Sequence, residues 1–270
     1  MKNKHLACVG YGSMAQAMIS SLVERGLIAR ANIIASGPNP EKLANVGQKF
    51  SIRFSTSNRD AVSNADFVFL ATKPQNLPEV AKEIGGRIPP EATVISILAG
   101  VPISTLETSL AHRRIVRAMP NLPACIQKGI TVWTATSQVA DADLTSIAEL
   151  LSCFGKHIYV KREGELDMAT ALSGTGPAYL FLYAEAMIDA GVHLGLSREI
   201  STKLVYETIS GSISFAIGSE IHPVNLRNAV TSPNGTTADA LYELEKGGFR
   251  TVISDAVWAA FRKSRSLGEK

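Results

Sequence analysis

A glycine-rich stretch near the N-terminus is the first part of the sequence that could do chemistry. Gly10 to Ala15 read GYGSMA, after a short apolar run at 5–9 and before a run with apolar residues at helical spacing. In this context Gly10 permits a tight turn, Gly12 lets a pyrophosphate approach the backbone, and Ala15 lets the helix pack closely on the strand. The helix N-terminus offers free N–H groups to phosphates. The stretch predicts a dinucleotide site, with a plain strand–helix turn as the alternative.

The end of the second expected strand, at 32–36, indicates which dinucleotide is bound. Enzymes that use NAD place an Asp or Glu there to hold the ribose 2′-OH. Here the chain continues Ser36-Gly37-Pro38-Asn39, and the first carboxylate is Glu41. A hydroxyl and backbone N–H groups accept a 2′-phosphate that a carboxylate would repel, so the sequence favours NADP(H), with NAD(H) as the second choice.

Two further turns follow expected strands at the same edge of the sheet. ATKPQ at 71–75 follows the strand at 67–72, which predicts Lys73 at the mouth of the cofactor cleft, with a solvated loop lysine as the alternative. Ala99-Gly100 ends the strand expected at 94–100. Ligands of open parallel sheets lie beyond the carboxyl ends of the strands, which makes both turns candidates.

Two glycine-containing segments stand out in the second half. SGTGPAY at 173–179 is expected to be a turn whose N–H groups face a small carboxylate, with Pro177 at the first helical position. TSPNGTTADAL at 231–241 contains a turn signal, after which Thr236 or Thr237 is expected to cap a helix with Asp239 in its first turn. The alternative for the threonines is that their hydroxyls face a ligand.

The elements that would position these residues alternate in the first half and are all helical in the second. Apolar runs expected as strands lie at 5–9, 32–36, 67–72, 94–100, 114–121, 130–135 and 157–160, with helical periodicity between several of them. This alternation predicts an α/β fold with a Rossmann-type, doubly wound, mostly parallel sheet. After about residue 160 only helical periods occur. We expect residues 1–161 to form the NADP-binding domain and 162–270 a helical domain for substrate binding and oligomerisation.

Composition narrows the class of protein. The 270 residues are 46% apolar and 19% charged with a net charge of +3, and no Lys/Arg run is dense enough for nucleic-acid binding. The first apolar stretch is too short for a signal peptide or a membrane span. Cys8, Cys125 and Cys153 are expected to be buried and reduced, which favours a cytoplasmic protein. The C-terminal helices are apolar on more than one face, which predicts an obligate oligomer built by these helices.

The sequence resembles the pyrroline-5-carboxylate reductase family along nearly its whole length. The resemblance lies in GYGSM, FLATKP, ILAGV, RIVRAMPNLPA, ALSGTGPAY, TSPNGTTADAL and the GGFR of 247–250, in this order and spacing. It implies a Rossmann domain, an interlocking helical dimerisation domain, and reduction of 1-pyrroline-5-carboxylate to L-proline with NAD(P)H, the last step of proline biosynthesis.

The resemblance also implies roles for individual residues. Those expected to bind the cofactor are Gly10, Tyr11, Gly12, Ser13, Met14, Ser36, Gly37, Pro38, Asn58, Ala71, Thr72, Lys73, Pro74, Ala99 and Gly100. Those expected to bind the substrate are Glu163, Ser173, Gly174, Thr175, Gly176, Thr236 and Thr237, with Thr237 as the catalytic residue beside the ring nitrogen or carboxylate. For Glu163 a surface charge at a hinge is the alternative.

The sequence departs from the family pattern at three positions. Thr175 stands where a second serine is usual, Asn234 stands in a Pro-Gly-Gly position, and Ala15 replaces the last glycine of the fingerprint. Asn tolerates left-handed backbone angles, so the turn at 233–235 can persist. None of the three removes a group that the chemistry needs.

Other chemistries find little support in the sequence. There is no GxSxG or HExxH, no metal-type spacing of Cys and His, and the five histidines are scattered, which predicts structural roles for them. Two alternatives stay open. A β-hydroxyacid dehydrogenase relative would need a catalytic lysine on a helix of its second domain, where Lys203 lies, and a non-catalytic NADP-binding regulator would need no substrate loops.

Overall fold

The computed structural model describes residues 1–268, which form two compact units. The first unit consists of Met1–Thr175 together with the chain from Ala260 onward, and the second of Gly176–Ala259. The first is an α/β unit and the second is helical, which confirms the predicted fold class. The predicted functional boundary after residue 161 lies before the point where the units separate, and it stays a prediction.

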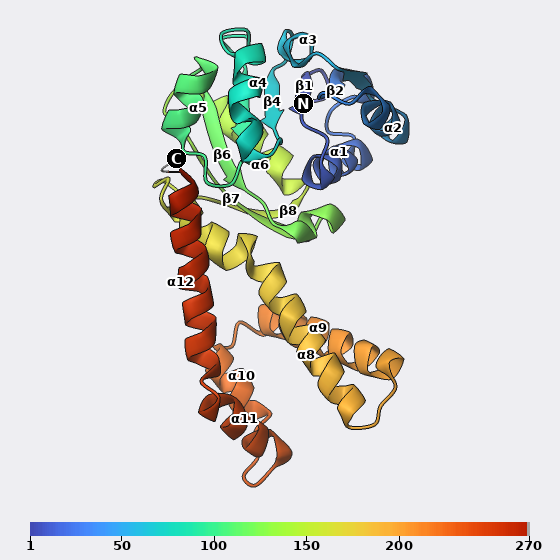
Figure 1. Cartoon of the computed structure of the whole chain (residues 1–270), viewed down its shortest axis with the longest axis vertical. Coiled ribbons are helices and arrows are strands. Elements are labelled where there is room, and N and C mark those ends of the chain that lie inside the picture. The colour runs from blue at the N-terminus through green and yellow to red at the C-terminus, as the bar shows by residue number, and fades with distance from the viewer. Residues whose placement is uncertain (269–270) are drawn as a thin grey trace. The chain divides into compact units, whose positions relative to one another are not determined.

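The first unit is built on one sheet, which has eight strands among the described residues (Figure 1). The strands lie in the order β3-β2-β1-β4-β5-β6-β7-β8, and neighbours are parallel except for β6 and β7. Their bounds are β1 Leu6–Val9, β2 Ile33–Ser36, β3 Arg53–Ser55, β4 Phe67–Leu70, β5 Thr93–Ser96, β6 Ile115–Met119, β7 Gly129–Ala135 and β8 Gly155–Tyr159. The chain order reverses between β1 and β4, and this switch point is where a doubly wound sheet binds its ligand.

Helices cover both faces of this sheet. The α-helices of the first unit are α1 Ser13–Arg25, α2 Pro40–Phe50, α3 Asn58–Val62, α4 Leu77–Ile84, α5 Ile103–Leu110, α6 Asp141–Ser152 and α7 Glu165–Ala169. Side chains alternate along β1, where Leu6 and Cys8 pack with α1, α2 and α6, and Ala7 and Val9 pack with α3, α4 and α5. Both faces of the central strands are buried, as their uninterrupted apolar sequences predict.

The predicted strands are largely confirmed, with two differences. The strand expected at 94–100 ends at Ser96, because the backbone turns and Gly100 adopts a positive φ of 73°. The short edge strand β3 was not predicted from the sequence, since only three residues of it pair with β2. Cys8 and Cys153 are buried as expected, and burial raises the pKa of the Cys8 thiol to about 12. The expectation for Cys125 is wrong, because its side chain is exposed.

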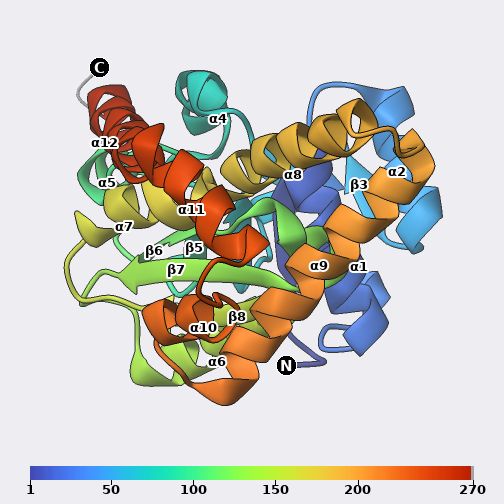
Figure 2. The same ribbon diagram turned by 90° about the horizontal axis from the view of Figure 1, so that it is seen from below.

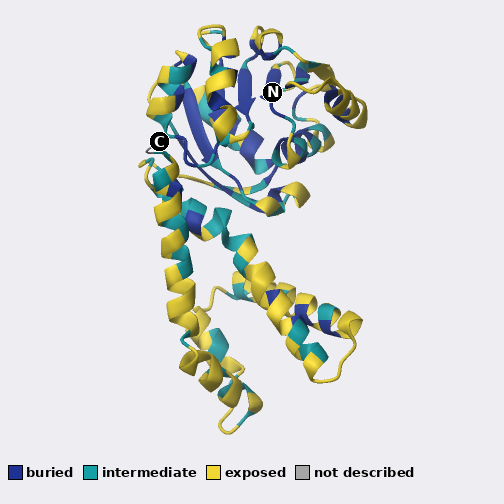
Figure 3. Cartoon of the chain, viewed as in Figure 1, coloured by how far each residue is buried: buried dark blue, intermediate teal, exposed yellow. Residues whose placement is uncertain are grey.

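The second unit contains helices joined by short turns (Figure 2). They are α8 Gly176–His193, α9 Arg198–Ser219, α10 Pro223–Ala229, α11 Thr236–Lys246 and the first part of α12 Phe249–Gly268. Helix α8 packs on α9 through Ala184, Ile188 and Val205, but most side chains of this unit are exposed (Figure 3). Exposed large apolar residues include Phe181, Leu182, Tyr206, Phe215, Ile217 and Trp258. No helix within residues 1–268 is long and apolar enough to cross a bilayer.

The segment SGTGPAY differs from its prediction. It was expected to be a turn, but residues Thr170–Gly174 form one π-helical stretch that follows α7 and leads through Thr175 into α8. Pro177 lies at the second position of α8, where a proline is tolerated because the first turn of a helix leaves its N–H groups unpaired. A π-turn inside a helix is rare and frequently marks a functional site.

Candidate active site

Gly10 lies at the switch point of the sheet, where β1, β2 and β4 end side by side. Its N–H donates to the Ser36 carbonyl over 2.9 Å, and the Ala71 N–H donates to the Val9 carbonyl over 2.9 Å. The φ of Gly10 is +110°, and a Cβ there would lie 2.6 Å from the Ala71 oxygen. Both observations require glycine. The structure thus brings together three of the turns that were predicted to bind the cofactor.

Gly12 is the N-cap of α1 and serves a different purpose from Gly10. It is exposed, and a Cβ on it would meet nothing within 4 Å. No acidic residue lies in the first turn of α1, so the positive end of the helix faces open space. The Gln16 side chain donates to the Tyr11 carbonyl over 3.0 Å and holds the turn that precedes the helix. The space in front of Gly12 is therefore open.

A hollow of about 440 Å³ adjoins this helix start. Its lining includes Tyr11, Gly12 and Ser13 from the turn and Lys42 and Lys49 from α2. The ring of Tyr11 lies over Gly37, since a Cβ on that glycine would be 2.4 Å from Tyr11 Cε1. The hollow thus lies beside the start of α1 and has two lysines on its wall, whose charge favours an anionic ligand.

Three buried polar atoms at this edge have no hydrogen-bond partner. They are Ser36 Oγ, Asn58 Oδ1 and Thr72 Oγ1, and all three residues were predicted to line the cofactor. Buried polar groups are almost always paired, so an unpaired set at one edge of a sheet needs an explanation such as a bound ligand. Ser36 itself is fully buried, whereas Pro38, next to it, is exposed together with Lys73 after β4.

The turn after β5 carries the predicted residues Ala99 and Gly100. Ala99 is half-buried, and Gly100 is buried against the end of α12. A Cβ on Gly100 would lie 2.5 Å from Leu267 Cβ, and one on Gly268 would lie 2.8 Å from the Gly100 oxygen. The positive φ and the close contact with Leu267 explain why a glycine stands at position 100. Ala99 and the backbone of the turn are the parts that remain open to a ligand.

Glu163 is held by partners that the sequence analysis did not identify. Its Oε1 atom accepts the Ile103 N–H over 2.7 Å and Arg117 Nη1 over 2.9 Å. Arg117 lies in β6 with a side chain 6% exposed, and its Nη2 donates to Asp167 Oδ1 over 3.1 Å. The alternative of a free surface charge at a hinge is therefore wrong. The only signal for Arg117 in the sequence is one cation within the apolar run IVRAM.

The hydroxyls of the π-helical stretch bond to their own backbone. Ser173 Oγ donates to the Ala169 carbonyl over 2.9 Å, and Thr175 Oγ1 donates to the Thr170 carbonyl over 2.9 Å. The Thr175 N–H also donates to the Thr170 carbonyl, over 2.8 Å. Gly174 packs on β6, since a Cβ there would lie 2.9 Å from the Met119 methyl carbon. The half-buried glycine thus belongs to the same end of the sheet as Arg117.

Thr236 and Thr237 belong to the second unit and begin α11. The prediction that one of them caps the helix is wrong, because the N-cap is Gly235, which has no side chain for capping. Asn234 adopts a φ of +56°, which confirms that it supports the turn in a left-handed conformation. Asp239 lies in the first turn of α11 as predicted. With capping excluded, the ligand-facing alternative remains for the two threonines.

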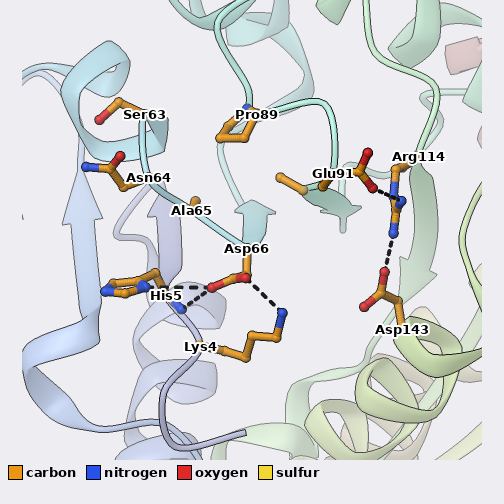
Figure 4. Close-up of a pocket in the computed structure, with 11 residues that line it drawn as sticks. Lys4, His5, Ser63, Asn64, Ala65, Asp66, Pro89, Glu91, Arg114 and Asp143 are labelled. Atoms are coloured by element: carbon orange, nitrogen blue, oxygen red, sulfur yellow. Dashed lines mark hydrogen bonds and ion pairs between the residues drawn. The ribbon is translucent and has the colours of Figure 1, made fainter.

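A second hollow, of about 560 Å³, lies at the opposite, amino edge of the sheet (Figure 4). Arg114 there joins Glu91 Oε2, at 2.7 Å, to Asp143 Oδ2, and Lys4 Nζ donates to Asp66 over 2.8 Å. Burial tends to raise the pKa of Asp66, but hydrogen bonds from Lys4 and the His5 N–H outweigh this and lower it. The charges are paired, and the edge is the wrong one for a dinucleotide, so this hollow is not the candidate site.

Two family profiles match the chain. Residues 163–267 match the profile of pyrroline-5-carboxylate reductase dimerisation, and residues 5–100 match that of NADP oxidoreductase, coenzyme F420-dependent. The chain is 40% identical over 271 aligned residues to a pyrroline-5-carboxylate reductase of Pseudomonas aeruginosa, covering 100% of this chain and 99% of the relative. It is 35% identical to that of Methanosarcina acetivorans, covering 100% of both.

A solved structure agrees with these sequence matches. The crystal structure of Plasmodium falciparum pyrroline carboxylate reductase with NADP bound superposes with a TM-score of 0.91, at 32% identity and 99% coverage of both chains. The match includes the α/β unit and the helical unit alike. The likeness therefore extends from the glycine turn at Gly10 to the helices after Gly176.

Proposed function

The chain belongs to the pyrroline-5-carboxylate reductase family, and from that premise we propose how its residues carry out the reaction. The protein is an NAD(P)H-dependent oxidoreductase that reduces 1-pyrroline-5-carboxylate to L-proline in proline biosynthesis. The observation that carries this function is 40% identity to a curated reductase over the full chain. It decides between the three interpretations of the sequence in favour of imine reduction.

We assign the cofactor to the edge of the sheet formed by the ends of β1, β2, β4 and β5. The open space at Gly12 and the start of α1 would take the pyrophosphate, and the turn at Ser36–Pro38 the 2′-phosphate. The unpaired atoms of Asn58 and Thr72 support contacts with the adenosine half, and Ala71 to Pro74 would line the ribose. Ala99 and Gly100 would border the nicotinamide. The absence of a carboxylate at the end of β2 supports a preference for NADPH.

We assign the substrate to Glu163, Ser173–Gly176 and Thr236–Thr237. The substrate is a cyclic imine with a carboxylate, and protonation of the imine nitrogen makes the carbon of the C=N bond electrophilic. When bound, the reduced nicotinamide supplies a hydride to that carbon. The backbone at 173–176 would orient the carboxylate, and the Thr237 hydroxyl would hydrogen-bond to the ring nitrogen. No nucleophile of the protein is needed, since orientation alone can remove roughly 7–11 kcal/mol of a barrier in favourable cases.

We further propose a homodimer formed by the C-terminal helices and assembled into a higher oligomer. The dimerisation profile matched by 163–267 supports it, as do the large apolar side chains exposed along α8, α9 and α12. We place cofactor binding in residues 1–161 and substrate binding and assembly in 162–270. We assign the enzyme to the cytoplasm, which the three free cysteines support.

The test is oxidation of NADPH or NADH with 1-pyrroline-5-carboxylate, followed by loss of absorbance of the reduced cofactor. A panel of 3-hydroxyacids with the oxidised cofactors serves as the comparison. We expect turnover with the imine alone and a lower KM for NADPH than for NADH. Turnover of a hydroxyacid, or tight NADPH binding without any turnover, would contradict the function, and a much lower KM for NADH would contradict the cofactor preference alone.

A further inference from the structure

We infer that Arg117 is a positioning residue for hydride transfer, which it serves by fixing the turn at Ala99–Ile103 and helix α7 at the end of the sheet. The inference rests on the proposed function, because that function assigns the nicotinamide to Ala99 and Gly100. Arg117 acts on this turn indirectly. It acts through two carboxylates, Glu163 and Asp167, which lie outside its own strand β6.

The first link joins Arg117 to the nicotinamide turn. Glu163 Oε1 lies 2.9 Å from Arg117 Nη1 and 2.7 Å from the Ile103 nitrogen. Ile103 is the first residue of α5, where backbone N–H groups have no partner within the helix. The carboxylate therefore caps α5 and fixes the end of the turn that begins at Ala99. Arg117 in turn fixes the carboxylate.

The second link joins Arg117 to the segments on either side of the second unit. Asp167 Oδ1 accepts Arg117 Nη2 over 3.1 Å and Ser264 Oγ over 2.8 Å. Asp167 lies in α7, just before the chain leaves the first unit, and Ser264 lies in the part of α12 where the chain has returned to it. One oxygen of Asp167 thus ties both segments to β6.

Packing contacts support the same arrangement. Leu267, one turn after Ser264, fills the space beside Gly100, and a Cβ on Gly100 would lie 2.5 Å from it. Arg117 and Met119 are two residues apart in β6 and so point to the same face of the strand. Met119 lies against Gly174 of the π-helical stretch. The nicotinamide turn, α7 and the π-helical stretch are therefore all fixed by the carboxyl end of one strand.

The geometry of the network explains why an arginine is present. A guanidinium offers several N–H donors in a fixed plane, so Nη1 and Nη2 can hold two carboxylates at once. A lysine has one nitrogen on a flexible stem and cannot fix both in the same way. The side chain of Arg117 is 6% exposed, and those of Glu163 and Asp167 are 33% and 17% exposed, so water screens these ion pairs only partly.

The decisive variant is Arg117→Lys in the full-length enzyme, with Asp167→Asn as a second variant that preserves the shape of a carboxylate partner of Arg117 and lies outside the residues assigned to the substrate. We measure kcat, the Kd of NADPH by fluorescence, and the isotope effect on kcat with NADPH deuterated at the transferred position. A misplaced nicotinamide should lower kcat by about 10- to 100-fold. The Kd of NADPH should change little, because the dinucleotide phosphates bind at Gly10–Met14. The isotope effect should increase, because hydride transfer then limits turnover.

Arg114→Lys is the matched control. Arg114 precedes β6 at its other end and also joins two carboxylates, Glu91 and Asp143 (Figure 4). We expect this variant to lose thermal stability while the folded enzyme keeps its kcat and isotope effect. If Arg117→Lys does not fold, the Asp167→Asn variant is the deciding one, and we expect it to show a smaller fall in kcat and the same increase in the isotope effect.

Two results would overturn the inference. If the folded variants keep the wild-type kcat and isotope effect and lose only stability, as expected for Arg114→Lys, the network is structural alone. If the Kd of NADPH rises while kcat stays unchanged, the network serves binding and not positioning. Absence of turnover in the wild-type enzyme would refute the proposed function and the inference together, which distinguishes that failure from the other two.

Discussion

The Cα of Gly10 lies directly against the backbone of Ala71, so closely that a Cβ would come within 2.6 Å of the Ala71 oxygen. The contact joins the ends of β1 and β4, between which the strand order of the sheet reverses. Gly12, two residues later, has no such neighbour. The two glycines are therefore needed for different reasons: Gly10 for packing within the fold, and Gly12 for the approach of a ligand.

We predict that Gly10→Ala and Gly12→Ala separate these requirements. Gly10→Ala should lower the free energy of unfolding by about 1–3 kcal/mol, because the backbone is strained at φ +110° and Ala71 must move. Gly12→Ala should lower the free energy of unfolding by less than about 1 kcal/mol, since its Cβ meets open space. It should raise the KM of NADPH about tenfold or more, because the Cβ would keep the pyrophosphate from approaching the backbone and its N–H groups. Denaturant unfolding and steady-state kinetics measure both. An unchanged KM in Gly12→Ala would contradict the phosphate site.

We predict that Thr237→Ala lowers kcat by about 100-fold, because a positioned hydroxyl that hydrogen-bonds to the imine nitrogen would be lost. Gly235 is the N-cap of α11, so the substitution removes no helix cap, and the thermal midpoint should change little. Thr237→Ser keeps the hydroxyl and is the matched control, with kcat near the wild-type value. Equal turnover in all three proteins would exclude a role in the reaction.

We predict that Leu182→Glu in α8 weakens subunit association. The Leu182 side chain is 67% exposed in the single chain, so a charge there does not disturb the fold of the chain itself. It would disturb an apolar interface, where an unpaired charge is costly to bury. Sedimentation at micromolar protein should show an oligomer for the wild type and for Leu182→Met, and dissociation for Leu182→Glu. A wild-type monomer at that concentration would contradict the proposed assembly.

We predict that stability falls as the pH drops below about 6.5, in part through His112. Burial lowers the pKa of His112, and its Nε2 lies 2.8 Å from the Ala92 carbonyl. The unfolded chain then takes up a proton at a higher pH than the folded one. The contribution of the neutral ring is therefore complete above the unfolded pKa and is lost as the pH falls through the folded pKa.

The thermal midpoint measured from pH 8 to pH 5 checks this prediction. His112→Gln replaces the ring with a group that does not titrate and can donate to the same carbonyl. The variant should show a smaller loss of stability on acidification than the wild type does. Identical pH dependence of the two proteins would assign the acid sensitivity to other groups.

The sequence could predict those parts of the molecule that depend on local chemistry. Two glycines between a strand and a helix, in GYGSMA, predict a phosphate-binding turn from six residues. Buried parallel strands such as FVFL can be predicted from their uninterrupted apolar sequence. The helical second half was equally evident from its periodicity. These features need no knowledge of which distant segments meet.

Features that depend on distant contacts could not be predicted. Arg117 and Glu163 are 46 residues apart, and nothing in either neighbourhood indicates the other. The glycines and hydroxyl residues of 173–179 predict a turn, because such residues normally interrupt helices, whereas Thr170–Gly174 is π-helical. Its hydroxyls instead bond back to the Ala169 and Thr170 carbonyls, which keeps the chain helical. The sequence also gives no sign that Leu267 fills the space beside Gly100.

That contact between Gly100 and Leu267 bears on the order in which parts of the protein can pack during synthesis. The sheet and its helices are encoded before residue 176, and a nascent chain can fold them as soon as they leave the ribosome. The space beside Gly100 stays unfilled until about 90 further residues have been translated and Leu267 follows. The turn at Ala99–Gly100 therefore cannot complete its packing until the end of α12 has been synthesised. A ribosome stalled within the helical unit would carry an α/β unit in which this turn is still unpacked.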